Sequence, residues 1–165
     1  MADTAPNSDL VPVQAALDSF LSSRASLVMG TRGEQGQVEL SVAPFLCEQG
    51  VFYVLLSGLA PHTGNLHRER SAEILLLEDE ADGRQAFARI RASLSCIAEP
   101  IDQNAAAGQV ALEKMEAAFG GIVALLRSLP DFQLFGLTPR EGRYIAGFGR
   151  AYRLSGLSVV EHLRG

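Results

Sequence analysis

Apolar residues recur at helical spacing near the start of the chain and at strand spacing along most of the rest. Val13, Leu17 and Phe20 are four and three residues apart, which predicts a short amphipathic helix. The apolar run 25–31 and the alternating residues 38–42 flank a polar connector with two glycines, which predicts a β-hairpin. Further short strands are predicted at 51–57, 72–77, 87–97, 132–137, 143–148 and 152–154.

Residues 101–128 have a different pattern, rich in alanine, glutamate and leucine, with apolar positions at helical spacing. Gly120 and Gly121 should divide this region into two helices, because paired glycines weaken a helix interior, and Pro130 should end it. Residues 155–163 are predicted to form a terminal helical turn.

Short strands at close spacing, with little helix between them, favour an antiparallel β-barrel over a βαβ sheet. The predicted class is therefore α+β, mainly β, with a helical insertion at about 102–129 between strands five and six. We expect one domain over 13–165, preceded by a disordered or loosely attached lead over 1–12.

Composition excludes several classes of protein. With 47% hydrophobic residues the 165-residue chain has enough apolar mass for a core, and its net charge of −5 argues against a sequence-independent nucleic-acid binder. No apolar run approaches the ~20 residues of a membrane-spanning helix, and the polar start has no signal-peptide pattern. We therefore expect a cytoplasmic protein with no nucleic-acid or membrane partner.

Common catalytic and metal-binding motifs are missing from the sequence: it has no GxGxxG before a helix, no P-loop, no HExxH and no GxSxG. His62 and His67 are five residues apart, which does not place them on one helix face as a zinc pair. The acidic run 78–82 is interpreted as a solvated turn rather than a cation site. Cys47 and Cys96 are interpreted as reduced, mostly buried thiols.

A polar segment follows the strand predicted at 51–57 and carries most of the candidate chemistry. Ser57, His62, Thr63 and Asn65 gather two hydroxyls, an imidazole and an amide within nine residues. Such groups at a loop-to-helix junction bind phosphate through side chains and helix N–H groups. The same pattern also fits an N-capped helix with an exposed histidine.

Arginine supplies thirteen of the fourteen basic residues, and its planar fork suits phosphate, carboxylate and propionate groups. Arg89 and Arg91 alternate with apolar residues in the strand predicted at 87–97, so they should share its polar face. A few such arginines near a pocket are enough to hold an anionic small molecule.

Several short segments, in order, resemble those of one known family. They are Ala43-Pro44-Phe45, Tyr53–Ser57, Ala60-x-His62-Thr63-x-Asn65-Leu66, Leu75–Glu80, Phe87-Ala88-Arg89-x-Arg91, Asp131-Phe132-x-Leu134-Phe135 and Gly147–Tyr152. Between about residues 14 and 156 the chain resembles the pyridoxamine 5′-phosphate oxidase-related split β-barrels, and more narrowly their heme-utilisation branch, the HugZ/HutZ-like proteins.

The resemblance implies a split-barrel homodimer with its ligand site at the subunit interface. In flavin-binding relatives the FMN phosphate is held just after the third strand, with help from the fifth. The positions so implied here are Ser57, His62, Thr63 and Asn65, with Arg89 or Arg91. The backbone around Ser41, Val42 and Ala43 would lie along the isoalloxazine ring.

Three functions follow from the resemblance. The first is an FMN-binding flavoprotein, an oxidoreductase but not a true pyridoxamine-phosphate oxidase, because His62 and Thr63 stand where such an enzyme has cations. The second is a heme-binding or heme-degrading protein, an oxygenase of heme utilisation. Its axial ligand would be His162, a few residues early for the branch's histidine, with Asp131 as acidic partner; His162 also fits a solvent-facing residue on a terminal turn. The third is a cofactor-less dimeric binder of small molecules.

Overall fold

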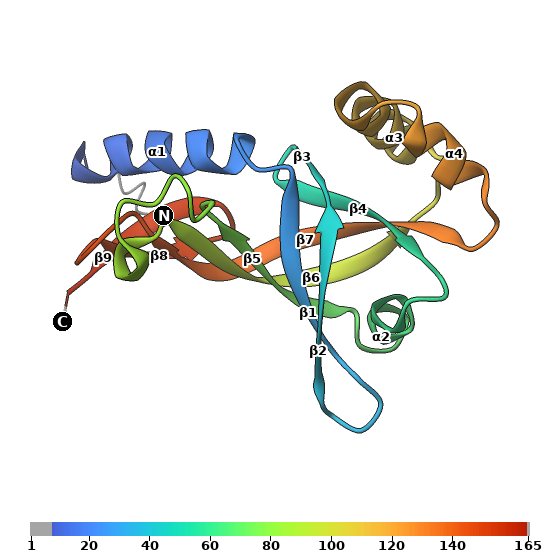
Figure 1. Ribbon diagram of the computed structural model, residues 1–165, viewed down its shortest axis with the longest axis horizontal. Coiled ribbons are helices and arrows are strands. Elements are labelled where there is room, and N and C mark those ends of the chain that lie inside the picture. Colours follow the sequence, from blue (N-terminus) through green and yellow to red (C-terminus); the bar gives the residue numbers. More distant parts are fainter. Residues whose placement is uncertain (1–7, 165) are drawn as a thin grey trace, which may run out of the picture.

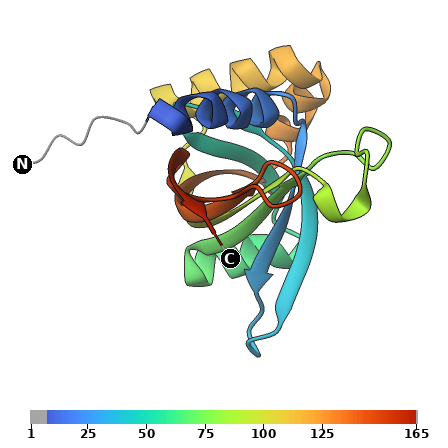
Figure 2. The ribbon, with the colours of Figure 1, turned by 90° about the vertical axis from the view of Figure 1, so that its left-hand side faces the viewer.

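The computed structural model describes residues 8–164 as one curled antiparallel sheet with helices on its outside (Figures 1 and 2). The helices are η1 (Ser8–Leu10, 3₁₀), α1 (Val11–Ser22), α2 (Pro61–Glu69), η2 (Ala86–Ala88, 3₁₀), α3 (Ala106–Phe119) and α4 (Ile122–Ser128). The strands are β1 (Ser26–Arg32), β2 (Val38–Pro44), β3 (Leu46–Glu48), β4 (Val51–Ser57), β5 (Ser71–Leu77), β6 (Arg91–Ile101), β7 (Phe132–Ile145), β8 (Ala151–Ser155) and β9 (Ser158–Leu163).

The strand order is β2-β1-β5-β6-β7-β4-β3, and β8 and β9 extend the sheet from the second half of β7. The first half of β7 pairs with β4 and its second half with β8, so one long strand belongs to both ends of the sheet. This is a split antiparallel β-barrel of the α+β class, as predicted. A short strand that the sequence did not predict, β3, puts the helical insertion between the sixth and seventh strands instead of the fifth and sixth.

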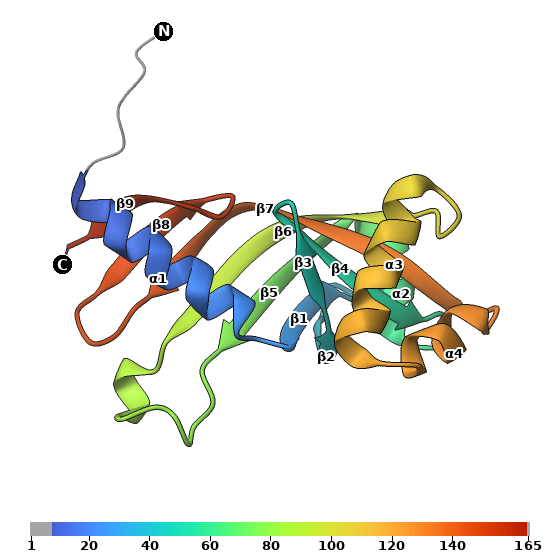
Figure 3. The ribbon, with the colours of Figure 1, turned by 90° about the horizontal axis from the view of Figure 1, so that it is seen from above.

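Two apolar clusters hold the sheet and helices together. α1 lies across β5, β8 and β9 (Figure 3) and buries the four residues of its predicted apolar stripe, Val13, Leu17, Phe20 and Leu21. At the other end, α3 and α4 bury a smaller cluster that includes Leu112 and Leu134. The glycine pair separates α3 from α4, as the sequence predicts.

The predicted strand 87–97 begins later than expected, at Arg91. Residues 86–88 form η2, and the side chain of Phe87 is 84% exposed. Hydrogen bonds tie the residues before β6 to Glu78, directly after β5: Ile90 N donates to the Glu78 carboxylate at 3.0 Å, and Arg89 Nε donates to the Glu78 carbonyl at 2.7 Å. Arg89 therefore lies outside the strand.

Two further predictions near the C-terminus are wrong. The turn expected at Thr138-Pro139 is absent, because β7 runs through both residues and takes up the irregularity as a register shift opposite Ser95 and Cys96. The helical turn expected at 155–163 is a hairpin instead: Gly156 adopts a left-handed φ of 57°, which starts the return strand β9.

The strand β2 exposes its apolar residues and turns its polar ones inward. Val38, Leu40 and Val42 are 75%, 74% and 67% exposed, on a strand that pairs only with β1. Glu39 and Ser41 lie on the opposite, partly buried face.

Part of the segment 1–12, expected to be disordered or loosely attached, is ordered: the chain is helical from Ser8 onward. Ser8–Leu10 and the start of α1 are helical, and Leu10 packs against the main apolar cluster. Residues 1–7 lie outside the described residues. Of the helices within residues 8–164, none has the length and apolar content needed to cross a membrane.

Candidate functional site

The junction between β4 and α2 is held to the start of β7 by short hydrogen bonds. Ser57 Oγ donates to Asp131 Oδ2 at 2.8 Å, and Gly58 N donates to the Asp131 carbonyl at 2.6 Å. Pro61 then stands in the first turn of α2, where a missing N–H costs nothing. The helix α2 begins at this proline and continues to Glu69.

Thr63 and Asn65 are buried and already have partners inside the protein. Thr63 is 1% exposed, and its Oγ1 donates to the Ser57 carbonyl at 2.6 Å. Asn65 is 5% exposed, and its Nδ2 donates to Thr31 Oγ1 at 3.0 Å and to Glu39 Oε2 at 2.7 Å. Both side chains therefore have a structural role: Thr63 ties the first turn of α2 to the end of β4, and Asn65 fixes α2 against the β1–β2 hairpin.

Ser41 and His62 lie together and lack partners. They line a hollow of about 330 Å³ between the inner face of β2 and the first turn of α2, together with Glu39, Leu40 and Pro61. Ser41 Oγ and His62 Nε2 are both buried without a hydrogen bond among the described residues. Burial also lowers the pKa of His62 below its usual value, so the imidazole is neutral at pH 7.

The neighbouring hollow, of about 520 Å³, lies between the β1–β2 hairpin and α2 and is lined by carboxylates. Glu34 and Glu39 line it together with Arg68. The guanidinium of Arg68 already donates to the Arg32 carbonyl and, at 3.1 Å, to Asn65 Oδ1. One engaged cation and two carboxylates give a phosphate group little electrostatic support here.

The predicted convergence of this loop with an arginine of the fifth predicted strand does not occur within one chain. Ala98 N donates to the carbonyl of Arg70 at the end of α2, whereas Arg91 is at the other end of β6. Seven residues at about 3.3 Å each separate them by about 23 Å along the strand. Arg89 lies on the loop beyond, where it pairs with Glu80 at 3.3 Å.

Of the three residues predicted to run along a flavin ring, Ser41 faces the hollow, Val42 points outward and Ala43 is buried in the core at 2% exposure. Their backbone belongs to an edge strand. A cofactor against this backbone stays a prediction.

His162 lies on β9, at the opposite end of the molecule from the junction of α4 and β7 that carries Asp131 (Figure 1). Its ring stacks on Tyr152 with centroids 4.8 Å apart, and its Nε2 is buried without a hydrogen bond among the described residues. The two residues line a hollow of about 350 Å³ with Leu10 and Val160. His162 is thus no solvent-facing residue on a helical turn, and within one chain it cannot meet Asp131.

The aromatic row behind His162 was not predicted. Tyr144 stacks on Tyr152 with centroids 6.3 Å apart, and the strand register places Tyr144, Tyr152 and His162 side by side on β7, β8 and β9. The alternation of residues in 143–154 predicts that Tyr144 and Tyr152 lie on strands. The place of His162 in the row depends on the pairing of β8 with β9, and the sequence predicts a helical turn where β9 lies.

The other histidine of α2 and the two cysteines have the following surroundings. His67 is hydrogen-bonded to Gln133, with His67 Nε2 and Gln133 Oε1 2.5 Å apart. Both cysteines are unpaired; burial, and after it the charge of Glu73, raises the pKa of Cys96 to about 12. No metal-binding cluster of His, Cys, Asp and Glu side chains occurs in the described part of the chain.

The fold and these sites define a split-barrel protein, and comparison with known proteins places it in a family. The pyridoxamine 5′-phosphate oxidase family model matches residues 13–146, so the chain belongs to that family. The chain is also 33% identical over 149 residues to the heme oxygenase HutZ of Vibrio cholerae, an alignment that covers 90% of this chain and 85% of HutZ.

Two solved structures are similar as well. The crystal structure of Vibrio cholerae HutZ, there called a heme storage protein, superposes with a TM-score of 0.73 at 32% identity over 76% of this chain and 89% of HutZ. Campylobacter jejuni ChuZ superposes with a TM-score of 0.84 at 27% identity over 98% of this chain and 65% of ChuZ. The predicted resemblance is confirmed.

Proposed function

We propose that this chain is a heme-binding protein of heme utilisation, and that it degrades heme. The observation that carries the proposal is the 33% identity with the heme oxygenase HutZ across nine-tenths of the chain. The identity favours this function over the FMN-binding oxidoreductase that the sequence also suggests.

The chemistry of the α2 junction supports heme over FMN. A flavin phosphate needs cations and free donors, but Thr63 and Asn65 are engaged internally, and Glu34 and Glu39 line the neighbouring hollow. His62 is held neutral by burial and brings no positive charge to this position.

The histidines fit heme iron, whose axial ligand is a neutral imidazole nitrogen. His67 has a partner, whereas His62 and His162 each keep a buried Nε2 with no hydrogen bond among the described residues. We assign the iron ligand to His162, because Tyr152 fixes its ring from one face. Bound heme would supply the oxygen chemistry, while His162 would hold the iron and Tyr152 would orient the imidazole.

The proposed assembly is a homodimer with the ligand site at the subunit interface. The exposed stripe of Val38, Leu40 and Val42 on an edge strand is the kind of surface that a second copy covers. His162 lies on β9 and Asp131 at the junction of α4 and β7, at the other end of the molecule, so Asp131 could act as partner to His162 only from a second copy of the chain.

A hemin titration followed at the Soret band tests the proposal. We expect saturation at one heme per chain, and at least tenfold weaker binding or a displaced band in His162→Ala, because the iron loses its ligand. His67→Ala is the matched control and should bind as the wild type does. The aerobic, heme-loaded protein should lose its Soret band when ascorbate is added.

Three results would count against the proposal. Absence of a saturable Soret band would reject heme binding, and an unchanged spectrum in His162→Ala would reject the assigned ligand. In the latter case, loss of the band in His62→Ala would move the axial role to α2. A stable Soret band under ascorbate and air would leave a heme binder without heme-degrading activity.

A further inference from the structure

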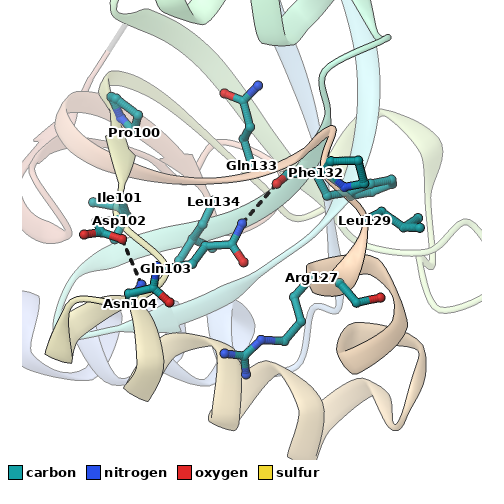
Figure 4. A pocket seen from close by; sticks show the side chains of 12 residues that line it. Pro100, Ile101, Asp102, Gln103, Asn104, Arg127, Leu129, Phe132, Gln133 and Leu134 are labelled. Atoms are coloured by element: carbon teal, nitrogen blue, oxygen red, sulfur yellow. Dashed lines mark hydrogen bonds between the residues drawn. The ribbon is translucent and has the colours of Figure 1, made fainter.

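A polar pocket of about 450 Å³ lies between the β6–α3 connection, the end of α4 and the first residues of β7 (Figure 4). It is distinct from the hollow beside α2 and lies at the other end of the molecule from the hollow at His162. Its polar side comes from Asp102, Gln103, Asn104 and Arg127, and its apolar side includes Leu129 and Phe132.

Arg127 is the unusual member of this pocket. Its side chain is half-buried and runs from α4 below Gln103 and Asn104 (Figure 4), yet it makes no hydrogen bond or ion pair with any residue from 8 to 164. The other arginines in that part of the chain that lack such a partner are all exposed: Arg32, Arg70, Arg84, Arg140, Arg143, Arg150 and Arg164. A guanidinium that is partly withdrawn from water without a counter-charge costs free energy, which a bound anion would recover.

The surrounding groups select the kind of anion. Gln103 Nε2 donates to the Phe132 carbonyl at 3.0 Å, which leaves its second amide hydrogen free to face a ligand. Asp102 Oδ1 accepts from Asn104 N at 2.9 Å, and its carboxylate disfavours a multiply charged group such as phosphate. The single guanidinium of Arg127 therefore suits a ligand with a single carboxylate group.

The apolar side of the pocket accepts the rest of such a ligand. Leu129 is 38% exposed, a substantial fraction for a leucine at the wall of a pocket, and Phe132 is only half-buried beside it. A short aliphatic or aromatic body would cover both side chains and remove apolar area from water.

We propose that this pocket binds a small monocarboxylate with an apolar body, which pairs its carboxylate with Arg127 and packs its body against Leu129 and Phe132. The pocket lies beside Asp131, which stands between the lining residues Pro130 and Phe132, but its proposed ligand contacts neither Asp131 nor His162.

A ligand-observed NMR titration of the full chain with benzoate tests the site. We expect saturable binding that is at least tenfold weaker in Arg127→Gln, since the charge-assisted fork is lost, and unchanged in Arg84→Gln, an exposed arginine without a partner. Benzyl alcohol, which keeps the ring and lacks the charge, should bind at least tenfold more weakly than benzoate. Inorganic phosphate should not displace benzoate at equal concentration.

The opposite results overturn the proposal. Non-saturable binding to the wild type, or equal benzoate affinity in a folded Arg127→Gln, would reject the site, and displacement by phosphate would reject the carboxylate class. If Arg127→Gln does not fold, Arg127→Lys keeps the charge without the fork: severalfold weaker binding supports the site and unchanged binding contradicts it. Failure here leaves the hemin titration unaffected, so the two proposals fail separately.

Discussion

The polar residues around α2 fall into two groups by whether their hydrogen bonds are satisfied. Thr63 and Asn65 are buried with short hydrogen bonds, as is usual for buried polar groups. At the same junction Ser41 Oγ and His62 Nε2 are buried and have no hydrogen-bond partner among the described residues. An unsatisfied buried polar atom costs about 1–3 kcal/mol, so this pair marks a place where the protein gives up stability.

His62 makes stability depend on pH in a defined direction. Burial lowers its pKa in the folded protein, so below the unfolded pKa, near 6.5, the unfolded chain binds more protons than the folded one. Stability contributed by His62 is therefore complete above pH 6.5 and falls as the pH drops through this value. Urea unfolding at pH 7.5 and 5.5 should show a larger loss of unfolding free energy for the wild type than for His62→Gln; equal losses would contradict the burial of the ring.

Sequence reasoning located these residues but not their partners. The segment 57–65 is polar, follows a strand and precedes a helix, which is visible from local pattern alone. The acceptors of the Asn65 amide nitrogen are Thr31 and Glu39, on a hairpin that is 26 to 34 residues earlier in the chain. A local sequence pattern does not reveal such a long-range contact. The sequence therefore does not distinguish a donor that bonds inside the protein from a donor that faces a ligand.

At the scale of elements, α2 is placed by the close approach of two strands at Gly58. A Cβ at Gly58 would stand 2.9 Å from the Asp131 carbonyl oxygen, a backbone atom that cannot move aside without shifting the start of β7. Gly64, in the middle of the helix, has nothing within 4 Å of the same position. The two glycines therefore serve different purposes.

This difference predicts opposite effects of the same substitution. Gly58→Ala should lower the free energy of unfolding by about 1–3 kcal/mol, the usual cost of overpacking. Gly64→Ala should raise it by about 0.5–1 kcal/mol, because alanine is the better helix former and meets no neighbour. Chemical denaturation of both variants measures this, and a stabilised Gly58→Ala would show that the β4–β7 contact is loose.

Elements with a strong local period were predictable, and those fixed by pairing were not. The apolar stripe of α1 and the β1–β2 hairpin formed as the sequence predicts. β9 was missed, because residues 158–163 gain their strand character from pairing with β8. β7 was divided in two, because Pro139 usually interrupts a strand and here sits at a register shift.

At the scale of the whole molecule, the long strand β7 joins two apolar clusters, one under α1 and one under α3 and α4 (Figure 3). β2 stands at the edge of this sheet with Val38, Leu40 and Val42 facing outward. A contiguous apolar stripe on an edge strand favours association with another surface.

The proposed homodimer makes this stripe an interface. Leu40→Lys should place a charge within it and shift the protein from dimer to monomer in light scattering coupled to gel filtration. Leu59→Lys is the control, since Leu59 is 88% exposed on the loop before α2. A wild type that is monomeric at micromolar concentration would contradict the proposed homodimer. A dimeric Leu40→Lys would show that the interface lies elsewhere.

The cofactor is the central claim, and one competition experiment addresses it most directly. Hemin is titrated into the full chain in the presence of excess FMN, with the Soret band and the flavin fluorescence recorded together. We predict a Soret band that saturates at one heme per chain while the flavin fluorescence stays that of free FMN. Quenched flavin fluorescence without a saturable Soret band would contradict the account and restore the flavoprotein.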